Sequence, residues 1–341
     1  MDTTTLQFLW YAVFIMCILA YAAFDGFDIG VGCLHLFAKS DMDRRICINA
    51  IGPVWDSNSL WIIITTGVLM AGFPAAFGVL FSALYMPMTL LIFGYIYRSV
   101  AIEFRSKIVS RRWRGFWDMM FALSSYCLAF GFGVVIANLI HGLPIDDHGT
   151  FIKSLKTLLS SYAILLGCFT TALFMLHGAL YLHLKTEGML QQRMKRWCWR
   201  LFIIFGLLWL AVNIVTPSYA AQVTARVEHT PLFALFSFLS ILAAGGLFWS
   251  LCKNRDGWAF VSSILIILSL VLFYALGTYP NLVRSSINEA YSMTIYNASS
   301  TPFTLKILLV IAAAGVPLIF LYMIYSYRVF RGKVEIDTMS Y

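Results

Sequence analysis

The chain has 341 residues, of which 60% are hydrophobic and only 12% are charged. Soluble globular proteins carry roughly 25% charged residues, so this composition excludes that class. The formal net charge of +8 does not indicate a nucleic-acid partner, because the basic residues stand in short segments between apolar runs, where they orient a membrane protein.

The first apolar run begins near Leu6. The N-terminus lacks the basic segment and small-residue cleavage site of a signal peptide, so we expect this span to be retained. Runs of about 20 residues, enough to cross a bilayer, recur along the sequence. The predicted spans, in chain order, run from Leu6 into 24–37 and over 53–72, 78–97, 118–140, 158–183, 201–220, 231–252, 258–279 and 306–327.

These nine spans predict an all-α, polytopic membrane protein with a single integral domain over residues 1–341. Lys and Arg alternate between the connecting segments: 19 fall on one side and five on the other. By the positive-inside rule, this bias predicts an N-terminus outside and a C-terminus in the cytoplasm. The seven cysteines show no CxxC or metal-ligand spacing and are interpreted as small apolar residues.

Four acids form the candidate site. Asp25 and Asp28 lie inside the first span, three positions apart, which places both on one helix face. Asp56 lies in the first turn of the second span, and Glu103 follows the end of the third. The predicted topology puts all four toward the cytoplasmic side. Acids at membrane depth are costly and usually functional, so chemistry is expected here.

The functional interpretation is a proton path from the cytoplasm, with Glu103 near its mouth and Asp56, Asp28 and Asp25 further in. Clustered carboxylates in a poorly hydrated site can hold and release protons near neutral pH. Structural alternatives stay open at this point. Asp25 or Asp28 could cap a broken helix, Asp56 could hold the first-turn amides of its helix, and Arg98 or Arg44 could pair with an acid.

The glycines of the first span bear on its packing and its end. Gly26, Gly30 and Gly32 either let a neighbouring helix approach closely or loosen the helix. If the span continues to Phe37, the acidic pair lies in the cytoplasmic half of the membrane. If it breaks at Gly26 or Gly30, the pair lies nearer the inner surface.

Several of these residues resemble subunit II of the cytochrome bd quinol oxidases. The specific part is Asp25-Gly26-Phe27-Asp28-Ile29-Gly30, with Arg44-Arg45 before Asn49 and Pro53-Val54-Trp55-Asp56-Ser57-Asn58 after it. The resemblance continues over the whole length in Glu103-Phe104-Arg105-Ser106-Lys107, Trp113-Arg114, Trp117-Asp118, His177-Gly178-Ala179-Leu180-Tyr181-Leu182, Lys185-Thr186-Glu187-Gly188, Trp258-Ala259-Phe260 and Pro280-Asn281.

The resemblance implies a multi-pass protein of the bacterial cytoplasmic membrane and a complex that oxidises quinol and reduces dioxygen to water. Its protons come from the cytoplasm, so turnover is electrogenic without pumping. Haem b and haem d are expected mainly in subunit I, the main partner. Membrane lipid, a small accessory subunit and a structural quinone are further candidate partners.

The same resemblance assigns residues. Acids at the positions of Asp56 and Glu103 belong to the family's proton path, and the Asp25 and Asp28 pair supports the subunit interface or proton uptake. The family often has Asp where this chain has Glu103, which places the carboxyl one methylene further out. Trp55 is a candidate haem or quinone neighbour.

No catalytic residue is expected in this chain alone. Of the six histidines only His177 lies well inside a span, and it is predicted to be a hydrogen-bonded interior histidine rather than a haem ligand. The rival function is a proton-coupled secondary transporter, which would usually show an internal repeat with paired broken helices. The C-terminal half has no second DGFD-like segment, which favours the oxidase. A scaffold whose acids only hold an interface is a third alternative.

Overall fold

A computed structural model describes residues 1–152, 155–228 and 230–336 of the chain. The α-helices are α1 (Thr3–Leu34), α2 (Asp41–Ile51), α3 (Trp55–Gly72), α4 (Pro74–Ala83), α5 (Tyr85–Phe104), α6 (Arg111–His141), α7 (Ser161–Lys185), α8 (Gly188–Tyr219), α9 (Ala221–Glu228), α10 (Pro231–Lys253), α11 (Asp256–Thr278) and α12 (Pro302–Val329). Short 3-10 turns are η1 (His35–Phe37), η2 (Leu155–Leu158) and η3 (Glu289–Tyr291), and β1 (Asn281–Val283) pairs antiparallel with β2 (Met293–Thr294).

Eight helices within the described residues are long and apolar enough to cross a membrane: α1 with η1, α5, α6, α7, α8, α10, α11 and α12. The one predicted span outside this set is the second in chain order, 53–72, which forms α3, whose 18 residues reach about 27 Å at 1.5 Å per residue. Its first turns carry Asp56, Ser57, Asn58 and Ser59, which lower its hydropathy. The all-α, polytopic fold is therefore confirmed.

The third span differs from its predicted form of one helix over 78–97. It consists of α4, which begins at Pro74, and α5, with a break at Leu84 between them. The break follows from Pro87, whose ring clashes with the carbonyl of residue 83 and which offers no N–H to it. Phe73 alone connects the second and third spans, because α3 ends at Gly72 and α4 begins at Pro74.

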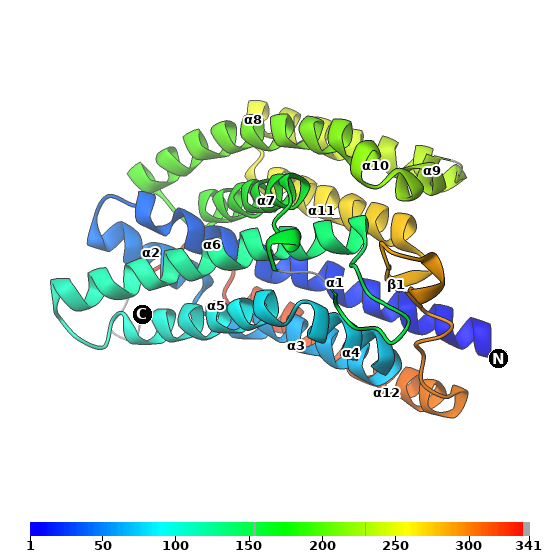
Figure 1. The fold of residues 1–341 in the computed structure, drawn as a ribbon. Helices are drawn as coiled ribbons and strands as arrows, with labels where there is room; N and C mark the ends of the chain where they lie inside the picture. Colours follow the sequence, from blue (N-terminus) through cyan, green and yellow to red (C-terminus); the bar gives the residue numbers. More distant parts are fainter. Residues whose placement is uncertain (153–154, 229, 337–341) are drawn as a thin grey trace.

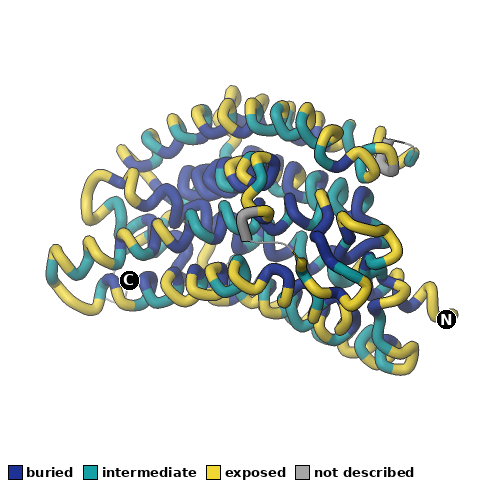
Figure 2. Tube along the Cα trace, viewed as in Figure 1, coloured by how far each residue is buried: buried dark blue, intermediate teal, exposed yellow. Residues whose placement is uncertain are grey.

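The helices lie side by side in layers, and the two termini lie at opposite ends of the bundle (Figure 1). Opposite ends agree with an odd number of crossings, while the orientation across the membrane stays a prediction. The outer helices α8 and α10 are largely exposed, whereas α1 and α7 carry much of the buried interior (Figure 2). The exposed outer faces are apolar, as expected of helices that contact lipid or a partner subunit.

Helix α1 is the centre of the bundle and packs against α3, α6, α7, α11 and α12. Glycine makes the closest of these contacts possible. A Cβ on Gly30 would lie 1.8 Å from the Phe174 carbonyl oxygen, and one on Gly178 would lie 2.5 Å from the Gly30 backbone. The interpretation of these glycines as a close-packing face is thus confirmed. The helix does not break at Gly26 or Gly30, so neither Asp25 nor Asp28 caps a helix end.

Candidate functional site

Asp25 is held by an arginine from another helix. Arg98 on α5 donates from Nη2 to Asp25 Oδ1 at 2.6 Å, and both side chains are fully buried. The same nitrogen donates to Ser59 Oγ at 2.7 Å, which ties α3 to the pair. The ion pair with Arg98, one of the structural alternatives, is therefore confirmed for Asp25.

Two tyrosines complete the surroundings of Asp25. Tyr95 on α5 donates to Asp25 Oδ2 at 2.9 Å, and its hydroxyl also contacts that of Tyr21. The Arg98 guanidinium lies 5.2 Å from the centre of the Tyr95 ring, within the range of a cation–π contact. Asp25 Oδ1 thus accepts from the Arg98 guanidinium, and Asp25 Oδ2 accepts from the Tyr95 hydroxyl.

Asp28, one turn further along α1, has different partners. Asn58 on α3 donates to Asp28 Oδ2 at 2.8 Å, and Asn58 Oδ1 in turn accepts from the Tyr327 hydroxyl of α12 at 3.0 Å. Asp28 is fully buried, and its Oδ1 accepts no hydrogen bond from the described residues. Both acids lie on one face of α1, as their three-residue spacing predicts, and both contact α3 through Ser59 and Asn58. Among the described residues only Asp25 has a cationic partner, which is Arg98 on α5.

The other two predicted acids lie nearer the surface. Asp56 is in the first turn of α3, as predicted, and its side chain is exposed. It stands one turn before Ser59, which contacts Asp25. Glu103 is half-buried in the last turn of α5, five residues after Arg98. The structure therefore brings Asp25 and Asp28 into one buried cluster and sets Asp56 and Glu103 outside it.

An apolar cleft of about 1480 Å³ opens beside this cluster. Trp55, Asp56, Ser59, Tyr21 and Tyr95 contribute polar groups to its lining, which is otherwise mostly apolar. Trp55 is buried at the start of α3. Such a cleft suits a long apolar chain more than a small polar solute.

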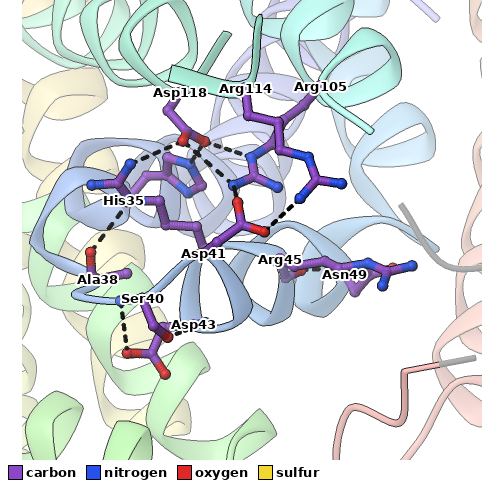
Figure 3. Close-up of polar contacts among 11 residues, drawn as sticks. His35, Ala38, Ser40, Asp41, Asp43, Arg45, Asn49, Arg105, Arg114 and Asp118 are labelled. Atoms are coloured by element: carbon purple, nitrogen blue, oxygen red, sulfur yellow. Dashed lines mark hydrogen bonds and ion pairs between the residues drawn. The ribbon is translucent and has the colours of Figure 1, made fainter. Parts of the chain in front are cut away.

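The sequence did not predict a second cluster of charged residues, centred on the buried Asp118, which we call the Asp118 cluster. Its members come from the end of α1, the start of α2, the end of α5 and the start of α6. They are Arg44 and, labelled in Figure 3, His35, Asp41, Arg105, Arg114 and Asp118. Asp118 is at its centre and is 2% exposed. The available signal was Asp118 itself, an acid at the start of a predicted span with six basic residues in the preceding segment.

Three side chains bind Asp118 directly. His35 Nε2 and Arg105 Nε both lie 2.5 Å from Oδ1, and Arg44 Nη1 lies 3.0 Å from Oδ2. Arg44 therefore pairs with Asp118 and not with an acid of the first predicted site. Asp41 accepts hydrogen bonds from Arg105 at 2.7 Å and from Arg114 at 2.8 Å. The cluster therefore connects the ends of four helices.

The three buried histidines of the described residues are engaged by neighbouring polar groups. His177 is fully buried, with Nδ1 2.7 Å from Ser263 Oγ and Nε2 3.0 Å from the Ala23 carbonyl oxygen, so the prediction of a hydrogen-bonded interior histidine is confirmed. His35 is engaged by Asp118, and His183 lies 3.2 Å from both Asp256 and the Gln191 carbonyl oxygen. His141 and His148 are exposed, and His229 lies outside the described residues.

Comparison with known proteins gives a consistent result over nearly the full length. The family model described as cytochrome bd terminal oxidase subunit II matches residues 6–330. The chain is 30% identical over 333 residues to cytochrome bd ubiquinol oxidase subunit 2 of Bacillus subtilis strain 168, covering 97% of each. It is 28% identical over 379 positions to cytochrome bd-I ubiquinol oxidase subunit 2 of Escherichia coli K12, covering 99% of each.

The fold also matches a solved structure. A chain of the bd oxidase from Geobacillus thermodenitrificans superimposes with a TM-score of 0.81 at 16% identity. The match covers 96% of this chain and 98% of that one.

Proposed function

Because the chain belongs to the family of cytochrome bd terminal oxidase subunit II, we propose that it carries protons toward the oxygen-reducing site of its complex. As a member of this family it is a subunit of a quinol oxidase, an oxidoreductase complex that contains haem and a subunit I partner. It is a multi-pass protein of the bacterial inner membrane.

The finer account of the activity is part of the proposal. Quinol oxidation is coupled to reduction of dioxygen to water, with protons taken from the cytoplasm, so turnover is electrogenic without pumping. Haem b and haem d are assigned mainly to subunit I. The engaged histidines of this chain support that assignment, since His177 has both ring nitrogens in hydrogen bonds. This chain supports assembly and supplies side chains to the proton path.

The charge balance around Asp25 carries the proposal. Two fully buried carboxylates, Asp25 and Asp28, stand beside one fully buried guanidinium, that of Arg98. A buried charge without a partner is strongly unfavourable, so the neutral form of this trio holds one proton. Asp25 has the guanidinium at 2.6 Å, and we therefore place the exchangeable proton on Asp28.

The hydrogen bonds of Asp28 distinguish its two carboxylate oxygens. Its Oδ2 is fixed by Asn58, which is itself held by Tyr327, whereas Oδ1 has no partner among the described residues. We propose Oδ1 as the oxygen that receives and passes on the proton. Asp56 and Glu103, at the exposed start of α3 and the half-buried end of α5, are assigned to proton uptake from the water.

We assign the apolar cleft to the tail of a structural quinone, with Trp55 as a neighbour of the bound molecule. The support is the size and mostly apolar lining of the cleft, to which Asp56 and Ser59 add polar groups. A small accessory subunit stays a prediction that follows from the family alone.

The proposed function is tested by purifying the tagged chain from its native membrane with its partners and recording a reduced-minus-oxidised spectrum. We expect a second large membrane subunit and the absorbance of haem. A preparation without haem and without that subunit would contradict the oxidase function itself. A normal spectrum would show haem and the partner subunit, whereas the proton path requires measurements on variants.

A further inference from the structure

The Asp118 cluster contains more hydrogen-bond donors and more positive charge than its acids use. Its ionised groups are Arg44, Arg105 and Arg114 against Asp41 and Asp118, which leaves one positive charge in excess even with His35 neutral. Nitrogen atoms of His35, Arg105 and Arg114, and of the neighbouring Trp117, are buried without a hydrogen-bond partner among the described residues. No oxygen of this cluster is left in that state.

In Arg105 and Arg114, some guanidinium nitrogens bind the acids of the cluster, and others have no hydrogen-bond partner among the described residues. Arg105 is 1% exposed, and its Nε and Nη2 face the two acids, so Nη1 is the nitrogen left over. Arg114 binds Asp41 through Nη1 and leaves Nε. On α6, Arg114, Trp117 and Asp118 follow at spacings of three and four residues, which puts all three on one face of the helix.

Apolar side chains surround the cluster on the outside of the protein. It lies where α1 and α5 end and α2 and α6 begin, at one end of the bundle (Figure 1). Large apolar side chains beside it are exposed, with Phe104 47%, Phe116 51% and Val109 90% exposed. Trp113 and Trp117 pack edge to face at 5.6 Å. Tryptophan is enriched at membrane–water interfaces. A ligand here meets buried cationic donors and an apolar surface together.

We propose that the Asp118 cluster binds the phosphate of one anionic phospholipid. A phosphodiester supplies the single negative charge and the acceptor oxygens that the donors of Arg105, Arg114 and Trp117 call for. The acyl chains then lie against the exposed apolar side chains. Basic pockets between membrane helices are known to recognise anionic headgroups in this way. A zwitterionic lipid carries its own cation and does not balance the excess charge.

The test uses the whole purified complex after removal of its endogenous lipid. It is titrated with phosphatidylglycerol, with phosphatidylcholine and with inorganic phosphate, and the bound species are counted by native mass spectrometry. We expect one phosphatidylglycerol to bind about tenfold or more tightly than phosphatidylcholine, the size of one charge-assisted hydrogen bond. Phosphate that binds as well as the anionic lipid would overturn the proposal in favour of a free anion.

Trp117→Phe is the decisive variant, because it removes one N–H and leaves every ion pair of the cluster in place. It should weaken phosphatidylglycerol binding about tenfold, and Arg114→Gln at least as much. The matched controls are Trp113→Phe, whose N–H already donates to the Phe104 carbonyl oxygen, and Arg112→Gln, an exposed neighbour of equal charge. Equal losses in variants and controls, or no loss with Trp117→Phe, would overturn the proposal.

Discussion

Arg98 Nη2 lies 2.6 Å from Asp25 Oδ1 at the centre of the bundle, and neither side chain is exposed. Asp28, one turn away on the same helix, makes no salt bridge within the described residues. Two neighbouring acids are therefore in unequal positions. Asp25 serves as the counter-ion of Arg98, and Asp28 is the acid that we propose to exchange a proton.

The Arg98–Asp25 pair should matter most when only one partner is removed. Arg98→Gln leaves a buried carboxylate without its cation, and we expect it to destabilise the complex by about 3–5 kcal/mol. Adding Asp25→Asn removes the orphaned charge and should restore much of that loss. The measurement is the thermal inactivation midpoint of the purified complex. A single variant as stable as the wild type, or a double variant no better than the single, would contradict the pairing.

The contact of α1 with α7 should be intolerant of a single methyl group. Gly30→Ala places a Cβ 1.8 Å from the Phe174 carbonyl oxygen, which forces the two helices apart. We expect a loss of about 1–3 kcal/mol, seen as reduced yield and thermal stability of the complex. Gly67→Ala is the matched control, since no atom lies within 4 Å of its added Cβ. If both alanine variants behave alike, the close approach is not a constraint.

The assignment of Asp56 to proton uptake predicts a kinetic defect without an assembly defect. Asp56→Asn keeps the shape of an exposed side chain but removes its ionisable proton. We expect quinol-driven oxygen consumption to fall on the order of tenfold at unchanged haem content. Asp147→Asn, in an exposed loop beyond the other end of α6, is the control and should respire normally. Normal respiration by Asp56→Asn would show that its carboxylate is dispensable.

The sequence predicted the spans and the shared face of the acidic pair because both depend on local periodicity. Long uncharged runs identify membrane helices, and a three-residue spacing places Asp25 and Asp28 on one side of α1. The break at Leu84 was not predicted, although Pro87 carries its cause. The proline ring clashes with the carbonyl group four residues earlier, so the helix is interrupted before the proline. Hydropathy alone does not show this interruption.

The contacts between helices could not be predicted from the sequence. Arg98 and Arg44 were both candidate partners of the acids, and only the approach of α5 to α1 pairs Arg98 with Asp25. The Asp118 cluster depends on four helix ends meeting, which brings Arg44 and Arg105 to one carboxylate across more than sixty residues of chain. In the sequence its members are separate charged residues, and the positive-inside rule already accounted for the basic ones.

The central claim is that Asp28 exchanges a proton during oxygen reduction, and proton uptake by the fully reduced complex tests it most directly. Reduced complex is mixed with oxygen in the presence of a pH-indicating dye, and the uptake rate of Asp28→Asn is compared with that of the wild type. Asn keeps the contact with Asn58 but cannot carry the proton. We predict uptake slowed on the order of tenfold at unchanged haem content. Uptake at the wild-type rate in a fully assembled Asp28→Asn complex would contradict the account.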